Sequence, residues 1–285
     1  IDFVVTLKTP PTTVVKSNVI YNLDGVNVAI TSDHYPLYCD FKKPTGLEEY
    51  PKAEGDLRIG NYFLTYCKGT DGVIDYDRTG RIIAKMNADI VCLQGLDKET
   101  ERSEGIDQLN VLAQKANMHD YFAKAIDYKG GEFGVGILTK EEPVSVDRYQ
   151  MAGKSEMRAA MVVEYEKFVV ASTNFDTDMA KRIEALQTLE TKLSAYNKPA
   201  FLLGYFNEGD LESEFFQMVK SNWNLLSADK STEVSGKKRR LDFIVSLKSH
   251  NVNVTQADVI ESLSGVDVTV ASTHYPLFCD FSGLK

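Results

Sequence analysis

The hydrophobic and polar positions of this chain follow two periods, one helical and one strand-like. Helical spacing, with apolar side chains on one face, occurs at residues 77–86, 105–116, 178–196 and 213–220. Strand-like alternation or short apolar runs occur at residues 56–66, 88–96, 121–126, 133–138, 144–149, 157–164, 168–173 and 199–203. Because several strands follow one another between the helices, the pattern predicts an α/β fold of mixed sheets flanked by helices.

The two ends of the chain carry nearly the same sequence. Residues 1–41 and 241–281 align without a gap, and about half of the positions are identical, which indicates an internal duplication. In the first copy we expect strands at residues 2–7, 26–30 and 37–41, and the closing set repeats them. Such a set of strands has no complete core of its own. The copies differ beside a shared histidine, where the first has Asp33-His34 and the second has Thr273-His274.

Composition excludes several classes of protein. The 285 residues are 43% hydrophobic and 10% aromatic, which is enough for a buried core. The net charge of -9 and the pI of about 5.1 argue against non-specific binding to nucleic acid, which needs a basic surface. No apolar run is long enough to cross a bilayer. The 4 cysteines are too few for a disulfide scaffold, so we expect buried thiols, which do not identify a compartment.

Five stretches in the larger part of the chain follow a recognisable order. They are RIGNYFLTYCKGTDG (58–72), ADIVCLQGLD (88–97), GGEFGVGILTK (130–140), VVASTNFD (169–176) and AFLLGYFN (200–207). LDFI (241–244) and STHYP (272–276) follow them. In this order they resemble the endonuclease/exonuclease/phosphatase superfamily of metal-dependent phosphodiesterases and phosphomonoesterases. The resemblance implies a DNase I-like sandwich of two mixed β-sheets flanked by helices.

The resemblance also assigns site positions, and several hold the wrong residue type. A divalent ion, usually Mg²⁺, polarises the phosphate in this family and is held by oxygen ligands. The positions that depart from the family are Cys67 for an Asn at the end of the first strand, Gly95 for the metal-binding Glu, Asn174 for a His, Tyr205 for the Asp that orients the attacking water, and Thr273 for an Asp. Only Asn207, Asp242 and His274 keep the expected types, and we call these three the remnant site.

These departures act together on the predicted metal site. A thiol is a poor Mg²⁺ ligand, and glycine has no side chain. Losing the acids at positions 95, 205 and 273 removes about three negative charges from a kind of site whose affinity depends on ligand charge. With Thr273 in place of an Asp, we also expect His274 to lack a carboxylate partner. Nearby acids that could compensate a single loss are Asp176, Glu208 and Glu132.

The sequence therefore predicts a catalytically inactive domain from a tandem array, which acts in binding, assembly or regulation and needs no cofactor. The alternative is an active metal-dependent phosphoesterase or nuclease with a rearranged site, which would require Mg²⁺. A measurement of Mg²⁺ or Mn²⁺ binding separates the two.

The resemblance gives the duplication a meaning. We expect residues 1–43 to be the closing segment of a preceding similar domain, residues 44–55 to be a linker, and residues 56–285 to be the domain itself. Because one domain has room for one closing segment, residues 1–41 should dock elsewhere, bind another chain or a neighbouring domain, or displace their counterpart. Displacement would put Asp33 and His34 in place of Thr273 and His274.

We also expect the chain to be a piece of a longer protein. It has no initiator Met, and Ile1 aligns with Leu241, which follows the basic run of residues 237–240. Cleavage by a trypsin-like protease and an artificial boundary both fit this start.

Overall fold

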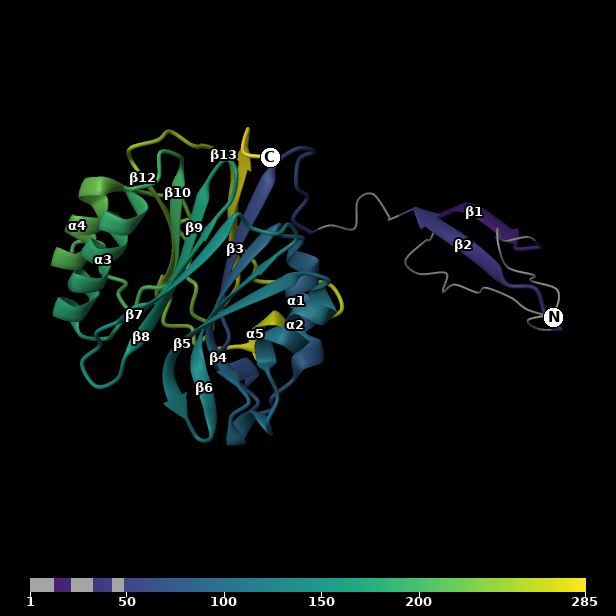
Figure 1. Ribbon diagram of the computed structural model, residues 1–285, viewed down its shortest axis with the longest axis horizontal. Helices are drawn as coiled ribbons and strands as arrows, with labels where there is room; N and C mark the ends of the chain where they lie inside the picture. The colour runs from purple at the N-terminus through teal and green to yellow at the C-terminus, as the bar shows by residue number, and fades with distance from the viewer. Residues whose placement is uncertain (1–12, 22–32, 43–48) are drawn as a thin grey trace. The chain divides into compact units, whose positions relative to one another are not determined.

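The computed structural model describes residues 13–21, 33–42 and 49–285, and its chain forms two compact units (Figure 1). The first unit is Ile1–Pro51 and the second is Lys52–Lys285. The boundary falls inside the predicted linker, and Lys52 already belongs to the second unit, where its Nζ lies 2.7 Å from Asp89 Oδ2. The predicted strands at residues 2–7 and 26–30 lie outside the described residues.

Two six-stranded sheets make up the second unit. The sheet that we call the β3 sheet has the order β13-β14-β3-β4-β6-β5, and the β10 sheet has the order β11-β12-β10-β9-β8-β7. The strands of the β3 sheet are β3 (Leu57–Phe63), β4 (Ile90–Lys98), β5 (His119–Tyr128), β6 (Gly131–Thr139), β13 (Asn253–Val259) and β14 (Leu277–Ser282). Those of the β10 sheet are β7 (Ser145–Met151), β8 (Arg158–Glu164), β9 (Val169–Asn174), β10 (Ala200–Tyr205), β11 (Trp223–Leu225) and β12 (Asp242–Leu247).

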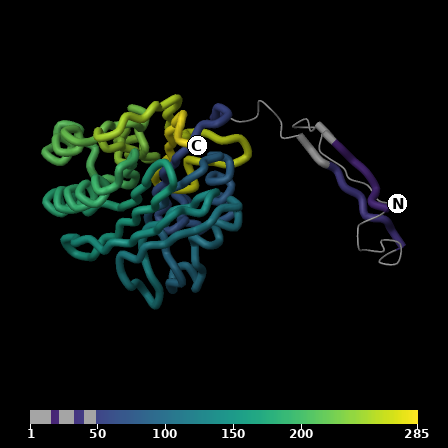
Figure 2. Tube along the Cα trace, turned by 45° about the horizontal axis from the view of Figure 1, so that its top comes forward, coloured from purple at the N-terminus to yellow at the C-terminus, as the bar shows by residue number. Residues whose placement is uncertain are grey.

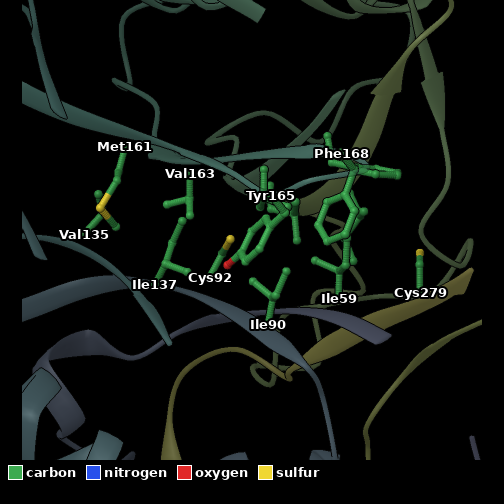
Figure 3. Close-up of a cluster of buried hydrophobic side chains, with 14 of the residues drawn as sticks. Ile59, Ile90, Cys92, Val135, Ile137, Met161, Val163, Tyr165, Phe168 and Cys279 are labelled. Carbon is green, nitrogen blue, oxygen red and sulfur yellow. The ribbon is translucent and has the colours of Figure 1, made fainter. Parts of the chain in front are cut away.

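The two sheets pack face to face around one apolar core (Figure 3). Successive side chains of a strand point to opposite faces, so every second residue of the central strands enters this core. Ile59, Ile90 and Ile137 contribute from the β3 sheet and face Met161 and Val163 of the β10 sheet. This layer fixes which strand ends meet at each rim of the sandwich.

Helices cover the outer face of each sheet (Figures 1 and 2). Helices α3 (Met179–Leu193) and α4 (Glu214–Asn222) lie on the β10 sheet and share a second core with it, which includes Leu186, Leu189 and Phe215. Helices α1 (Tyr76–Met86) and α2 (Gln108–Ala116) lie on the β3 sheet. Glycines let these helices approach closely, since a Cβ at Gly60 would overlap Met86 Sδ and one at Gly136 would lie 2.7 Å from Leu109 Cδ1.

The predicted α/β fold of mixed sheets flanked by helices is confirmed. All predicted helices and strands between residues 56 and 220 are present, with their ends shifted by a few residues. One prediction is wrong in the second copy: residues 266–270, the counterpart of the strand expected at 26–30, contain the short helix α5 (Val268–Ala271). Its N-cap is Asp267, whose side chain accepts a hydrogen bond from Thr269 N at 3.0 Å, and this local bond favours a helical turn over extended chain.

Two short 3-10 turns complete the second unit, η2 (Thr65–Cys67) and η3 (Glu101–Ser103). Cys67, Cys92 and Cys279 are buried free thiols, as expected, whereas Cys39 of the first unit is half-buried. Burial raises the pKa of the Cys92 thiol to about 12. In the described residues, no helix combines the length and apolarity that crossing a bilayer requires.

The described part of the first unit is a β-hairpin. Strands β1 (Thr13–Val19) and β2 (Leu37–Lys42) pair antiparallel as a two-stranded sheet. Asp33 and His34 lie before β2 and are exposed. The interpretation of this unit as the closing segment of a preceding domain stays a prediction.

Candidate functional site

Several predicted site residues of the second unit lie at or next to strand ends that meet at one rim of the sandwich. β9 and β10 run parallel with Tyr205 paired to Asn174, and β3 and β4 run parallel with Phe63 paired to Gln94. β12 runs antiparallel to β10 and pairs Asp242 with Tyr205. The core residues Leu203 and Ile244 lie two residues from Tyr205 and Asp242, so both of these side chains also point between the sheets.

Three rings fill the space where these strand ends meet. The ring centroids of Phe63 and Tyr205 lie 4.6 Å apart, and the His274 ring lies 4.8 Å from each of them. His274 is 5% exposed, and it comes from the segment between α5 and β14. We call Phe63, Tyr205 and His274 the ring cluster. It joins the end of β3 to the end of β10 through apolar and edge contacts.

Within the remnant site, His274 and Asp242 form a close pair. His274 Nδ1 lies 2.6 Å from Asp242 Oδ2, and both side chains are buried. The expectation that His274 lacks a carboxylate partner is therefore wrong, because β12 supplies one in place of residue 273. The second carboxylate oxygen, Asp242 Oδ1, is buried and has no hydrogen-bond partner among the described residues.

Position 205, where the resemblance places an acid, holds a ring that stays neutral. Burial, followed by the negative charge of Asp242, raises the pKa of the Tyr205 hydroxyl. Ionising it beside a carboxylate inside the sandwich would place two negative charges together in a poorly solvated place. Tyr205 therefore adds no negative charge to the site at ordinary pH.

Position 95, where the resemblance places an acid, is a closely packed glycine. It lies in a bulge of β4 with φ +74, and a Cβ built on it would lie 3.3 Å from Phe63 Cε2 and 3.3 Å from Thr65 N. A side chain at position 95 would adopt an unfavourable backbone conformation and press against the ring cluster. The glycine and the phenylalanine thus fit one another.

The structure corrects the position of Cys67. β3 ends at Phe63, four residues before Cys67, which lies buried in the turn η2. The side chain at the end of the first strand is therefore Phe63, because the strand stops earlier than the predicted range of 56–66. A benzyl ring has no lone pair to offer a metal ion, so Phe63 fits the ligand that the resemblance implies even less than a thiol would.

The remaining predicted residues are held by neutral hydrogen bonds. Asn207 Nδ2 donates to Phe175 O at 2.7 Å and lies 3.4 Å from Asn174 Oδ1, which also brings these two asparagines together. Thr273 Oγ1 lies 3.0 Å from Thr65 Oγ1. Asn207 therefore lies at the rim beside Asn174, one strand away from the Asp242–His274 pair.

The acids that could compensate for the lost ligands are engaged elsewhere. Asp176 accepts from Arg158 Nε at 3.0 Å, Glu208 from Arg182 Nη2 at 3.1 Å, and Glu132 lies 3.4 Å from Lys124 Nζ. Among the residues that the structure describes, no group of three or more His, Cys, Asp and Glu side chains is arranged to bind a metal ion. The donor set that the fold family implies for Mg²⁺ does not fit here, since a ring and a glycine stand where oxygen ligands are needed.

Two features of the rim are missing from the predicted site. Phe63 could have been found from the alternation Ile59, Asn61, Phe63, which places the third side chain on the face of the first. A buried polar bridge also lies behind the ring cluster: Gln94 Nε2 is 2.8 Å from Asn61 Oδ1 and 3.2 Å from Ser172 Oγ of the other sheet. Polar residues inside apolar runs were its signal in the sequence.

Of two cavities in the second unit, one lies beside this site and the other lies at the opposite rim. A cavity of about 460 Å³ is lined by Asn207 and by the basic residues Lys238 to Arg240, together with acids such as Glu208 and Asp229. A larger cavity, of about 810 Å³, is lined by Leu57, Ile90 and Phe168, which begin or precede strands that end at the site. It therefore opens at the opposite rim, and of these two cavities the larger does not mark the site.

Comparison with known proteins supports the fold. No protein-family model and no curated protein matches the sequence. Among solved structures, an endonuclease/exonuclease/phosphatase of Beutenbergia cavernae is 17% identical, covering 81% of this chain and 73% of its own, with a TM-score of 0.64. A mannosyl-6-phosphatase of Bacteroides thetaiotaomicron is 15% identical, covering 79% of this chain and 99% of its own, with a TM-score of 0.62.

The human Nocturnin catalytic domain with a bound sulfate anion is a third similar structure. It is 18% identical, covering 80% of this chain and 93% of its own, with a TM-score of 0.59. At such identities the similarity concerns the fold and leaves the activity open. Two mixed sheets with helices outside, together with these matches, show that the chain has the DNase I-like fold of the endonuclease/exonuclease/phosphatase structures.

Proposed function

We propose that the second unit is a non-catalytic domain of this fold, which acts in binding, assembly or regulation within a tandem array. The ring cluster carries the proposal. Phe63 and Tyr205 lie 4.6 Å apart at the strand ends that provide oxygen ligands in the family, and Gly95 provides no ligand beside them. A hard cation needs several oxygen ligands, and the described residues hold no group of three or more His, Cys, Asp and Glu side chains arranged to bind one. Asp242, the acid of the remnant site, already pairs with His274.

The ring cluster also supports a structural role for this rim. Rings in contact contribute about 0.5–1.5 kcal/mol per pair beyond the area that they bury. Ser272 Oγ donates to Phe63 O at 2.6 Å and thereby ties the closing segment to the end of β3. Contacts that stabilise the sandwich thus occupy the place of the contacts that would bind substrate.

One observation favours the alternative of an active phosphoesterase or nuclease. The Asp242–His274 pair is intact at 2.6 Å, and a buried carboxylate orients a histidine for proton transfer in many hydrolases. The similar structures include a phosphatase and a sulfate-bound catalytic domain, so a phosphate ester is the substrate class to test.

Hydrolysis and metal binding separate the two proposals. The full chain is incubated with bis(p-nitrophenyl) phosphate and with p-nitrophenyl phosphate, each with millimolar Mg²⁺ or Mn²⁺ or with a chelator. We expect the same rate with metal as with chelator, and no heat of metal binding by calorimetry. The Bacteroides mannosyl-6-phosphatase under the same conditions is the positive control.

The variant His274→Ala decides how a positive result is interpreted. A metal-dependent rate that His274→Ala abolishes while the protein keeps its circular dichroism spectrum would overturn the inactive assignment. A rate that survives in His274→Ala would come from a contaminating hydrolase and would leave the assignment in place.

A further inference from the structure

The hairpin of the first unit has the same backbone pairing as the last hairpin of the second unit. β1 and β2 pair Ser17 with Cys39, and β13 and β14 pair Ala257 with Cys279, which are the equivalent positions of the two copies. Both hairpins carry a bulge at the same place, between Val14 and Lys16 in one and between Val254 and Gln256 in the other. The duplicated sequence therefore folds twice into one register.

The bond that closes each hairpin is also duplicated. Ile20 N donates to Pro36 O at 2.7 Å, and Ile260 N donates to Pro276 O at 2.7 Å. A one-residue slip would turn every side chain to the opposite face. Because the register is the same, the side chains of β2 alternate between faces as those of β14 do.

In the second unit, the second strand of the closing hairpin, β14, has β13 on one side and another partner strand on the other. β14 pairs antiparallel with β3, with Cys279 opposite Ile59 and Asp280 opposite Arg58. Arg58 Nε and Nη2 each donate to the Asp280 carboxylate at 2.7 Å, and the guanidinium lies 3.9 Å from the Phe278 ring centroid. This buried arginine binds a carboxylate of β14 and also contacts an aromatic ring of the same strand.

The hairpin of the first unit keeps the residues that β3 recognises. By sequence and register, Tyr38 stands at the place of Phe278 and Asp40 at the place of Asp280. Leu37, Tyr38 and Cys39 are only half-buried, whereas their counterparts in β14 are 0% exposed. Lys16 Nζ, from the paired strand β1, lies 5.6 Å from the Tyr38 ring centroid, so this ring already has a cation beside it.

Counting closing hairpins against edges identifies the partner. In the described residues the chain has two such hairpins and one β3 edge, which β14 fills. Each further copy of the chain brings two more closing hairpins but only one more β3 edge. If copies exchange hairpins, one hairpin per chain therefore still has no β3 edge among the described residues. We propose that the β1–β2 hairpin docks through β2 onto the open β3-type edge of another domain of this fold, one without its own β14 strand and with an arginine at the place of Arg58.

The side chains that the two copies share explain why the hairpin would bind such a partner selectively. The main-chain bonds of an added strand provide affinity for any open edge, whereas side chains in register provide specificity. Here the specific element is a planar, bidentate arginine between Asp40 and Tyr38, which a lysine would not reproduce. A partner strand without this arginine would leave the carboxylate at position 40 without its ion pair on burial.

The experiment uses the β3 edge of this chain as the partner edge for the β1–β2 hairpin. In the full-length protein, Asp280→Ala removes the carboxylate that Arg58 needs and weakens the docking of β14. Ile59→Cys with Cys279→Ser then leaves Cys39 as the cysteine that the register places opposite position 59. After oxidation, we expect peptide mass spectrometry to find a disulfide between Cys39 and the new cysteine, in one chain or between two copies, since either presents a β3-type edge.

Matched variants test the specificity. Asp40→Ala should lower the yield of this disulfide on the order of tenfold, because the charge-assisted bond to Arg58 is lost. Ser17→Ala introduces the residue that the second copy has at that place and should leave the yield unchanged. Ile59→Cys alone, with Cys279 retained, should link position 59 to Cys279 and shows that the edge geometry permits a disulfide.

Two results would overturn the proposal. One is no disulfide to Cys39 in the variant with Asp280→Ala, although the variant that retains Cys279 links as expected. The other is an equal yield with and without Asp40→Ala, which would mean that the hairpin collides with the edge without recognising it. Neither result bears on hydrolysis, so the inactive assignment of the rim stands or falls separately.

Discussion

Phe63 shows how a single side chain changes what the site can do. Its ring contacts Tyr205 and His274 and lies 3.3 Å from the place of a Cβ on Gly95. Gly95 has φ +74, where a residue with a Cβ is strained. The glycine at position 95 and the ring at position 63 therefore depend on one another, and an acid introduced at position 95 alone would press against the Phe63 ring.

We expect Gly95→Ala to destabilise the second unit more than Gly105→Ala does. Both glycines have φ +74, which costs an alanine about 1–2 kcal/mol. A Cβ at Gly105 meets nothing within 4 Å, whereas a Cβ at Gly95 meets Phe63 and Thr65 at 3.3 Å, and such overpacking adds about 1–3 kcal/mol. Urea unfolding measures both free energies, and equal losses would show that Phe63 moves aside freely.

At the scale of elements, the strand ends decide which residues form the site. The parallel pairs β3–β4 and β9–β10 bring their carboxyl ends to one rim, and β12 runs the other way and begins there. The helices outside hold this arrangement through the second core, where Leu189 of α3 is 0% exposed.

We expect Leu189→Ala to lower the free energy of unfolding by about 2–5 kcal/mol, because it leaves a cavity between α3 and the β10 sheet. The exposed Thr188 is the control on the same helix, and Thr188→Ala should stay within about 0.5 kcal/mol of the parent protein. Denaturant unfolding followed by circular dichroism measures both. A small effect of Leu189→Ala would mean that the helix repacks over the gap.

At the scale of the whole molecule, all strand pairings of both sheets lie within residues 52–285. The two cores and the helices that cover them lie there as well. The first unit contributes a hairpin with an edge that its counterpart uses for pairing with β3. An isolated two-stranded hairpin is marginally stable in water, which is a physical reason for it to seek a partner.

We expect a fragment of residues 52–285 to fold on its own and to unfold in one cooperative transition, since it keeps every strand pair of both sheets. A fragment of residues 52–240 lacks β12, β13 and β14 and should not fold, because β3 and β10 each lose a neighbouring strand. Thermal unfolding and size-exclusion chromatography compare the two. Failure of the longer fragment to fold would show that the first unit is needed for the second.

The sequence alone determined the order and type of the elements between residues 56 and 220, because period-2 and period-3.6 patterns are local properties of the chain. It also revealed the duplication, and with it the predicted places of Asp33 and Thr273. The residue at which a strand ends was harder to predict, because it depends on the neighbouring strands in the sheet. The sequence therefore placed Cys67 at the end of the first strand, where the structure has Phe63. The Asp242–His274 pair joins two segments that are distant in sequence, and only their meeting at the rim supplied the carboxylate.

The same division holds for the hairpin and the ring cluster. The duplication predicted two similar segments, but the shared bulge and register required the backbone of both. The ring contacts among Phe63, Tyr205 and His274 come from three separate stretches, and no local pattern reports a distance between them. Local sequence fixes what each strand presents, whereas tertiary packing decides which side chains share a site, because that depends on which strand ends meet at one rim.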